Sequence, residues 1–128
     1  MNKTCVVVVS GSLERLQMAA MVTSVAAVSG HETLVFLSMN ALPHFIKEKK
    51  IKAPAEGEMG KLMLEKKVPE FKTLFEQAVE LGDARIYPCS MAMDVLGVEK
   101  RDLEAYLGEA TGLTKFLDDA KDSQVWTF

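Results

Sequence analysis

The two cysteines of this chain, Cys5 and Cys89, stand in different surroundings. Cys89 follows an apolar segment and a proline, and a helical pattern begins directly after it. At such a position the free backbone N–H groups and the positive end of the helix dipole favour a nucleophilic thiolate. Cys5 lies inside an apolar run, where burial disfavours the charged thiolate. We therefore predict that Cys89 is reactive and that Cys5 is part of the core.

Spacing argues against several well-known cysteine chemistries at Cys89. The phosphate loop of cysteine phosphatases requires an arginine at the position that Val95 occupies here. No C-x-x-C pair is present, and a thiol oxidoreductase would need a resolving thiol that the buried Cys5 does not supply. The two cysteines and two histidines show no metal-ligand spacing, so no metal site is predicted.

Several other side chains are candidates for binding a substrate near the thiol. Met91 and Met93 either fill the core or form an adaptable apolar wall beside the sulfur, and Ser90 offers a hydroxyl group. His44 follows a predicted strand and is either a solvated loop residue or a partner of Cys89. The complete predicted binding set is Ser10, Ser12, Asn40, His44, Ser90, Met91 and Met93.

Alternating strands and helices are expected to position these side chains. Apolar segments, most of them rich in β-branched or aromatic residues, predict five strands, at residues 4–9, 33–37, 84–87, 105–107 and 124–128. Apolar residues at helical spacing predict helices at residues 13–29, 60–65, 69–81, 90–96 and 113–120, with a short helix and a loop in the segment from residue 39. This alternation is typical of βαβ units. We predict one three-layer α/β domain over residues 1–128, with a mostly parallel sheet of about five strands and helices on both faces.

Glycine, proline and serine residues mark the predicted helix ends. Pro69 fits the first position of the helix at 69–81, and Gly82 fits the position just past its end. Gly30 suits the end of the first helix. Ser10-Gly11-Ser12 lacks the G-x-G-x-x-G and G-K-[ST] patterns of nucleotide-binding loops, so we interpret it as a tight turn in which Ser12 caps the next helix. In parallel sheets, ligands bind beyond the carboxyl ends of the strands, where this turn and Cys89 are both expected.

Size and composition limit the classes of function. The chain has 128 residues, of which 48% are hydrophobic and 26% charged, as expected for one globular domain. Its net charge of −3 does not favour non-specific binding to nucleic acid or to an anionic membrane. No apolar stretch has the length of a signal peptide or a membrane span. We therefore predict a cytoplasmic protein with reduced thiols.

The first predicted helix has almost no polar side. Between residues 18 and 28 only Thr23 and Ser24 are polar. The helix is either deeply packed or lies between its own sheet and a second subunit, and we predict a homo-oligomer. A lysine cluster is interpreted as a solvated face, with partner docking as the alternative; it comprises Lys47, Lys49, Lys50 and Lys52.

Residues 87–97, Tyr-Pro-Cys-Ser-Met-Ala-Met-Asp-Val-Leu-Gly, resemble the cysteine motif of the DsrE/DsrF-like family. That motif has a cysteine, one residue, methionine, a small residue, methionine, aspartate, two apolar residues and glycine. Ala92 stands at the small position, where serine is common. The valine-rich first strand, and the helix at 69–81 that leads through Gly82 into the strand before Cys89, are also similar to the family. The resemblance covers most of the chain and is weakest over residues 39–67.

The resemblance implies a sulfur carrier that holds a persulfide on Cys89 and works within an oligomer, with no metal or organic cofactor. Its partners would be sulfur donor and acceptor proteins or small thiols. In this role Asp94 is expected to be structural. The alternative is a non-catalytic module for small-ligand binding or assembly, in which Cys89 only lines a pocket.

Overall fold

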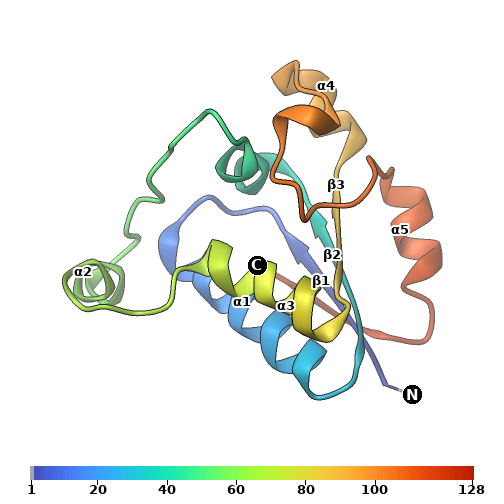
Figure 1. Ribbon diagram of the computed structural model, residues 1–128, viewed down its shortest axis with the longest axis horizontal. Coiled ribbons are helices and arrows are strands. Elements are labelled where there is room, and N and C mark those ends of the chain that lie inside the picture. Colours follow the sequence, from blue (N-terminus) through green and yellow to red (C-terminus); the bar gives the residue numbers. More distant parts are fainter. Residues whose placement is uncertain (1) are drawn as a thin grey trace.

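Four parallel strands form the central sheet, in the spatial order β3-β2-β1-β4 (Figure 1). The computed structural model describes residues 2–128. The strands are β1 (Lys3–Val8), β2 (Glu32–Leu37), β3 (Arg85–Pro88) and β4 (Gln124–Thr127). Their register places Val6 beside Val35, and Val35 beside Ile86. β1 and β2, which lie at the centre, are almost completely buried, as the continuous apolar runs predict.

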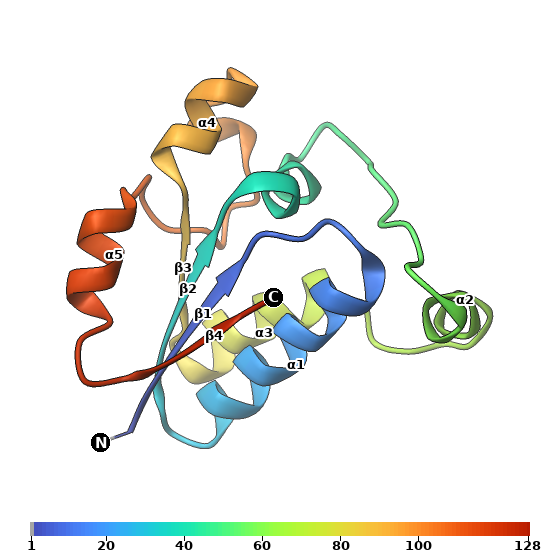
Figure 2. The same ribbon diagram turned by 180° about the vertical axis from the view of Figure 1, so that it is seen from behind.

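Helices cover both faces of this sheet, so the three-layer α/β prediction is confirmed. Figures 1 and 2 show two helices packed side by side on one face and one helix on the other. The pair is α1 (Leu13–Val28) and α3 (Phe71–Gly82), and the single helix is α5 (Leu113–Asp119). The shorter helices are η1 (Met39–Phe45), α2 (Glu58–Glu65), α4 (Ser90–Leu96) and η2 (Lys100–Asp102).

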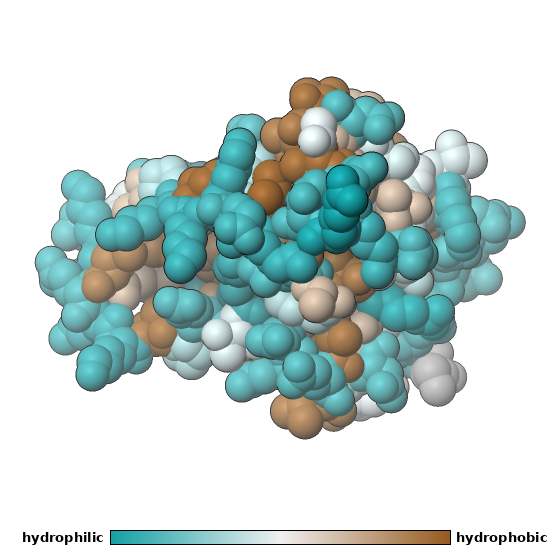
Figure 3. Space-filling view, turned by 45° about the horizontal axis from the view of Figure 1, so that its top comes forward, coloured by the Kyte–Doolittle hydropathy of each residue, from teal (hydrophilic) through white to brown (hydrophobic). Residues whose placement is uncertain are grey.

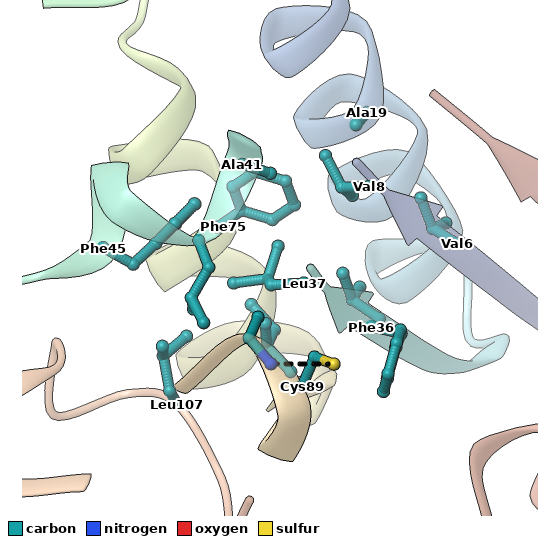
Figure 4. Close-up of a cluster of buried hydrophobic side chains, with 14 of the residues drawn as sticks. Val6, Val8, Ala19, Phe36, Leu37, Ala41, Phe45, Phe75, Cys89 and Leu107 are labelled. Atoms are coloured by element: carbon teal, nitrogen blue, oxygen red, sulfur yellow. Dashed lines mark hydrogen bonds between the residues drawn. The ribbon is translucent and has the colours of Figure 1, made fainter. Parts of the chain in front are cut away.

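The core follows from the alternation of side chains along the strands. Val8 and Leu37 lie on the face covered by α1 and α3, close to Ala19 and Phe75 (Figure 4). Phe36 points to the opposite face, where its ring lies 5.1 Å from the ring of Phe116 in α5. Each face of the sheet therefore has its own apolar layer.

The predicted strand at residues 105–107 is wrong, and the sheet has four strands rather than five. Residues 105–106 form a turn that places Leu107 in the core. The chain then runs along the free edge of β3, where the Gly108 N–H donates to the Ile86 carbonyl at 2.7 Å and the Thr111 N–H donates to the Pro88 carbonyl at 2.9 Å. The apolar residues that suggest a strand are thus explained by the packing of a turn.

The ends of α3 also differ from the prediction. The helix begins at Phe71 rather than at Pro69, and Gly82 is its last helical residue rather than the cap. Asp83 takes the left-handed conformation instead, with φ 56°. A Cβ atom on Gly82 would lie 2.6 Å from the Cβ of Ala27 in α1. The glycine is therefore required by the close approach of two helices and not by the end of one.

Gly82→Ala is expected to lower the free energy of unfolding by about 1–3 kcal/mol, because the added methyl group forces α1 and α3 apart. The backbone carbonyl carbon of Ala27 would lie only 2.8 Å from the new Cβ, so no side-chain rotation relieves the clash. Urea titration followed by circular dichroism measures the effect. A variant as stable as the wild type would show that the two helices separate at little cost.

One side of α1 is uncovered in a single copy of the chain. The helix packs on the sheet and on α3 through its small residues, and its outward apolar side chains are between 46% and 68% exposed; they are Met18, Met21, Val25 and Val28. The interpretation of α1 as a deeply packed helix is therefore wrong for this side. No helix within residues 2–128 is both long enough and apolar enough to span a membrane.

Candidate functional site

The carboxyl ends of β1, β2 and β3 lie next to one another, and the candidate residues follow them directly. Backbone hydrogen bonds join the segments that leave the sheet there. The Cys89 N–H donates to the Leu37 carbonyl at 2.8 Å, and the Asn40 N–H donates to the Val9 carbonyl at 3.0 Å. The sheet thus holds the cysteine, η1 and the turn after β1 at one edge, as predicted for a parallel sheet.

Cys89 occupies the N-cap position of α4, which confirms its predicted place between a strand and a helix. Its backbone is extended, with φ −69° and ψ 123°, and its Sγ accepts a hydrogen bond from the Ala92 N–H at 3.5 Å (Figure 4). The first N–H groups of a helix have no partners within the helix, so a sulfur at this position satisfies one of them. The geometry directs a donor and the positive end of the helix at the thiol.

Thr111 supports this position, although the sequence contains no local signal for it. It pairs with Cys89 across a parallel bridge, and its carbonyl accepts the Ser90 N–H at 3.0 Å. Thr111 is buried. Cys89 is therefore held from both sides, by Leu37 of β2 and by Thr111. This pairing joins segments that are far apart along the chain, so periodicity does not reveal it.

The two methionines that flank Cys89 in the sequence have different environments. Met93 is buried with Ala92 in the core, whereas Met91 is 49% exposed. Met39, the first residue of η1, and Val95 on α4 are also exposed. Helix α4 packs against η1, and Figure 3 shows hydrophobic side chains gathered where α4 forms the top of the molecule. Cys89 itself is only 5% exposed, while apolar side chains of the neighbouring α4 and η1 face solvent.

The other candidates from the sequence gather where β1 and β2 end. Gly11 lies so close to η1 that a Cβ atom would be 2.8 Å from the Asn40 carbonyl oxygen and 3.2 Å from His44 Nε2. β2 and the start of η1 separate this turn from the end of β3. Within residues 2–128 no hydrogen bond joins His44 to Cys89, so the Cys–His pair is not formed.

Ser12 stands at the N-cap position of α1, but its side chain makes no capping hydrogen bond. Its hydroxyl donates instead to Glu56 Oε1 at 3.0 Å, and its N–H donates to Ser10 Oγ at 3.1 Å. The predicted N-cap position of Ser12 is therefore confirmed, but its capping hydrogen bond is not formed. Glu56 lies in a loop that is remote in the sequence, and the hydrogen bond to its carboxylate directs the Ser12 hydroxyl away from the end of the helix.

His44 is buried, which contradicts its interpretation as a solvated loop residue. Within residues 2–128 its Nδ1 atom has no hydrogen-bond partner, and its ring meets the edge of the Phe71 ring at 6.1 Å. Burial lowers the pKa of His44, and the positive charge of Lys72 lowers it further, while the backbone at Ile51 and Gly11 opposes the shift. His44 is therefore held in its neutral form.

The stability of the fold is expected to decrease as the pH falls below about 6.5, the ordinary pKa of histidine in an unfolded chain. Because the pKa of His44 is lowered in the folded state, the unfolded chain binds the proton first, and protonation favours unfolding. In His44→Gln the free energy of unfolding should vary less with pH just below that value. Urea titrations between about pH 5 and 8 measure the slope, and an unchanged slope would contradict the assignment.

Comparison with known proteins agrees with the fold and with the cysteine motif. The sequence model of the DsrE/DsrF/DrsH-like family matches residues 46–128. The ychN protein from E. coli has 19% identity and a TM-score of 0.66, and the protein of unknown function MTH1491 from Methanobacterium thermoautotrophicum has 9% identity and a TM-score of 0.67; both align over 100% of both chains. No curated protein sequence matches significantly. The structural likeness shows a shared fold, and the family match covers most of the sequence, including Cys89: the chain belongs to the DsrE/DsrF/DrsH-like family.

Proposed function

We propose that this protein is a sulfur carrier that holds sulfane sulfur as a persulfide on Cys89 and passes it to an acceptor thiol. The observation that carries the proposal is the place of the Cys89 sulfur at the amino end of α4, where it accepts the Ala92 N–H. Membership of the DsrE/DsrF/DrsH-like family supports a sulfur-relay fold.

The proposed transfer is a thiol–persulfide exchange in two steps. The Cys89 thiolate attacks the outer sulfur of a donor persulfide, the S–S bond of the donor breaks, and the donor leaves as a thiolate. An acceptor thiolate then attacks the terminal sulfur on Cys89 and releases the Cys89 thiolate. Each step forms one S–S bond and breaks another, so no oxidant, reductant, metal or organic cofactor is required. We place this chemistry in the cytoplasm, where thiols stay reduced.

The surroundings of Cys89 suit a negatively charged sulfur. The Ala92 N–H and the amino end of α4 are directed at the sulfur, on which negative charge develops during the proposed exchange. Met93 excludes water from the inner side, and the half-buried Ser90 next to the cysteine offers a hydroxyl group. The exposed Met39, Met91 and Val95 form the surface on which we expect a donor or acceptor protein to dock.

Incubation with a small persulfide donor tests the proposal. Intact-mass spectrometry should show one added sulfur of about 32 Da. Peptide mapping should place this sulfur on Cys89, and an added acceptor thiol should remove it. If no donor produces an adduct on Cys89, the sulfur-carrier function is wrong and the binding or assembly module becomes the better hypothesis.

We also propose that the protein forms a homo-oligomer through α1 and β4. The exposed stripe of α1 includes Met21 and Val25, which line a shallow cavity together with Trp126 of β4. β4 is an edge strand, and Val125 and Trp126 are about half exposed. A second copy would cover the stripe, the tryptophan and the unpaired edge of β4 at once.

The double variant Met21→Glu/Val25→Glu is expected to shift the protein to a monomer, because an oligomeric interface would bury two unpaired carboxylates. Light scattering coupled to size exclusion measures the mass. Lys115→Glu on the exposed side of α5, across the sheet, is the control and should leave the oligomer intact. A monomeric wild type at micromolar concentration would contradict the proposed assembly.

A further inference from the structure

A cavity of about 800 Å³ opens on the side of the molecule where α2 lies. Its volume is in the range of pockets that hold small organic molecules. Five segments form its walls: the start of α1, the start of α3, the loop after η1, the end of α2 with the residues that follow it, and the chain at Glu104. Neither Cys89 nor any other residue of α4 lines it, so the cavity is distinct from the proposed sulfur site.

The lining combines apolar surface with an unusual number of lysines. The apolar part includes Leu13, Ile51, Ala53, Leu64, Val68 and Phe71. Seven of the fifteen basic residues of the chain also line the cavity; they are Lys47, Lys49, Lys50, Lys52, Lys66, Lys67 and Lys72. The only acidic residues in the lining are Glu70 and Glu104. A protein with a net charge of −3 therefore concentrates positive charge around one concavity.

Most of these lysines lack an acidic partner. Within residues 2–128, eight basic residues form ion pairs, and Lys72 is the only one of them that lines the cavity, paired with Glu104 at 2.8 Å. The other six lysines of the lining form none. The chain has eighteen acidic residues, so enough carboxylates exist to pair with these lysines, yet none within residues 2–128 does. The positive charge around the cavity is therefore free to attract an anionic ligand.

Specific contacts hold the walls of the cavity in place. The Glu14 carboxylate in the first turn of α1 accepts N–H groups of Gly57 at 2.7 Å and Gly60 at 3.1 Å, and thereby fixes the start of α2. The Glu56 N–H, which also donates to this carboxylate at 2.7 Å, lowers the pKa of Glu14 most, and the N–H groups of Gly57 and Gly60 lower it further. The Gln17 side chain donates to the Pro69 carbonyl at 2.9 Å and holds the chain between α2 and α3. The cavity is therefore formed before a ligand arrives.

We propose that this cavity binds a small organic polyanion, a phosphate or diphosphate group attached to an apolar or aromatic body. The lysines would surround the phosphates, and the floor at Leu13, Ile51 and Phe71 would contact the body. Lysines from three different segments line one concavity, which favours a small molecule over an acidic protein segment. The inference goes beyond the sulfur-carrier function and does not depend on it.

Calorimetric titration of the full chain with three probes tests the inference. ATP carries phosphates on an aromatic body, geranyl diphosphate carries them on an aliphatic body, and pyrophosphate has no body. We expect one of the first two to bind at least about tenfold more tightly than pyrophosphate, because only they reach the apolar floor. Tighter binding of ATP would identify an aromatic phosphate ligand, and tighter binding of geranyl diphosphate an aliphatic one.

Paired charge variants localise the binding. Lys50→Gln/Lys66→Gln removes a lysine from each of two walls and should weaken binding at least about tenfold. Lys115→Gln/Lys121→Gln removes the same charge from the α5 side of the sheet and should change it little. Persulfide uptake on Cys89 should be the same in both double variants.

Four results would overturn the inference. They are no binding of any probe, equal binding of pyrophosphate, equal weakening by both double variants, and tighter binding of a hexaglutamate peptide than of all three probes.

Discussion

Cys89→Ser is expected to abolish persulfide formation, whereas Cys5→Ser is expected to retain it. A serine hydroxyl does not carry sulfane sulfur, so removal of the reactive thiol should eliminate the added mass of about 32 Da completely. Cys5 is fully buried in β1, and its Sγ accepts a hydrogen bond from Ser123 Oγ at 3.3 Å. Burial raises the pKa of Cys5 and keeps it as an unreactive thiol. Intact-mass spectrometry after incubation with the donor distinguishes the two variants.

The interpretation requires that both variants fold. Far-ultraviolet circular dichroism and the midpoint of urea unfolding provide this control. If folded Cys89→Ser still gains a sulfur, or if folded Cys5→Ser gains none, the assignment of the carrier to Cys89 is wrong. A third variant, Cys5→Ala, removes the hydrogen bond from Ser123 and tests whether that contact contributes only to stability.

Phe116→Ala is expected to lower the free energy of unfolding by about 3–5 kcal/mol, the usual effect of removing a buried aromatic side chain. Phe116 is fully buried and is the only buried residue of α5. Its ring packs 5.1 Å from Phe36 of β2, so it joins α5 to the sheet. Without this side chain, one face of the sheet loses the main contact of its covering helix. Urea titration at neutral pH measures the change.

Leu117→Ala is the matched control in the same helix. Leu117 follows Phe116 directly but is 51% exposed, so its truncation should change stability by less than about 1 kcal/mol. Similar losses in the two variants would contradict the packing of α5 through Phe116. A loss in Phe116→Ala below about 1 kcal/mol would mean that the α5 face contributes little to the core.

Patterns within single elements allowed most of the fold to be predicted. The apolar run of β1 indicates a strand with both faces covered, because no polar side appears in it. Pro88-Cys89 lies between a strand and a helix. Because all strands of a parallel sheet run in one direction, the sequence alone places the thiol at the carboxyl end of the sheet. These features depend on neighbours along the sequence, so the sequence was sufficient for them.

The wrong predictions depend on contacts between remote segments. Gly82 has the residue type that ends a helix, but it is required by the close approach of Ala27 in α1. Ser12 stands at the N-cap position, yet its hydroxyl donates a hydrogen bond to Glu56 and does not cap the helix. His44 looks like a solvated loop residue, but η1 and Phe71 bury it. The lysines at residues 47–52 are exposed as predicted, but the cavity that they line is formed by segments remote along the chain, so the sequence does not reveal it.

The pairing of β4 with β1 has a consequence for synthesis on the ribosome. Thr4 lies opposite Gln124, so β1 obtains its second neighbour only after residue 124 has left the exit tunnel. Until then, one edge of a valine-rich strand is open to other nascent chains. Such a contact between distant residues also slows folding, since a long loop must close before it forms. Emergence of β4, rather than emergence of the first βαβ unit, is therefore the event that protects this edge.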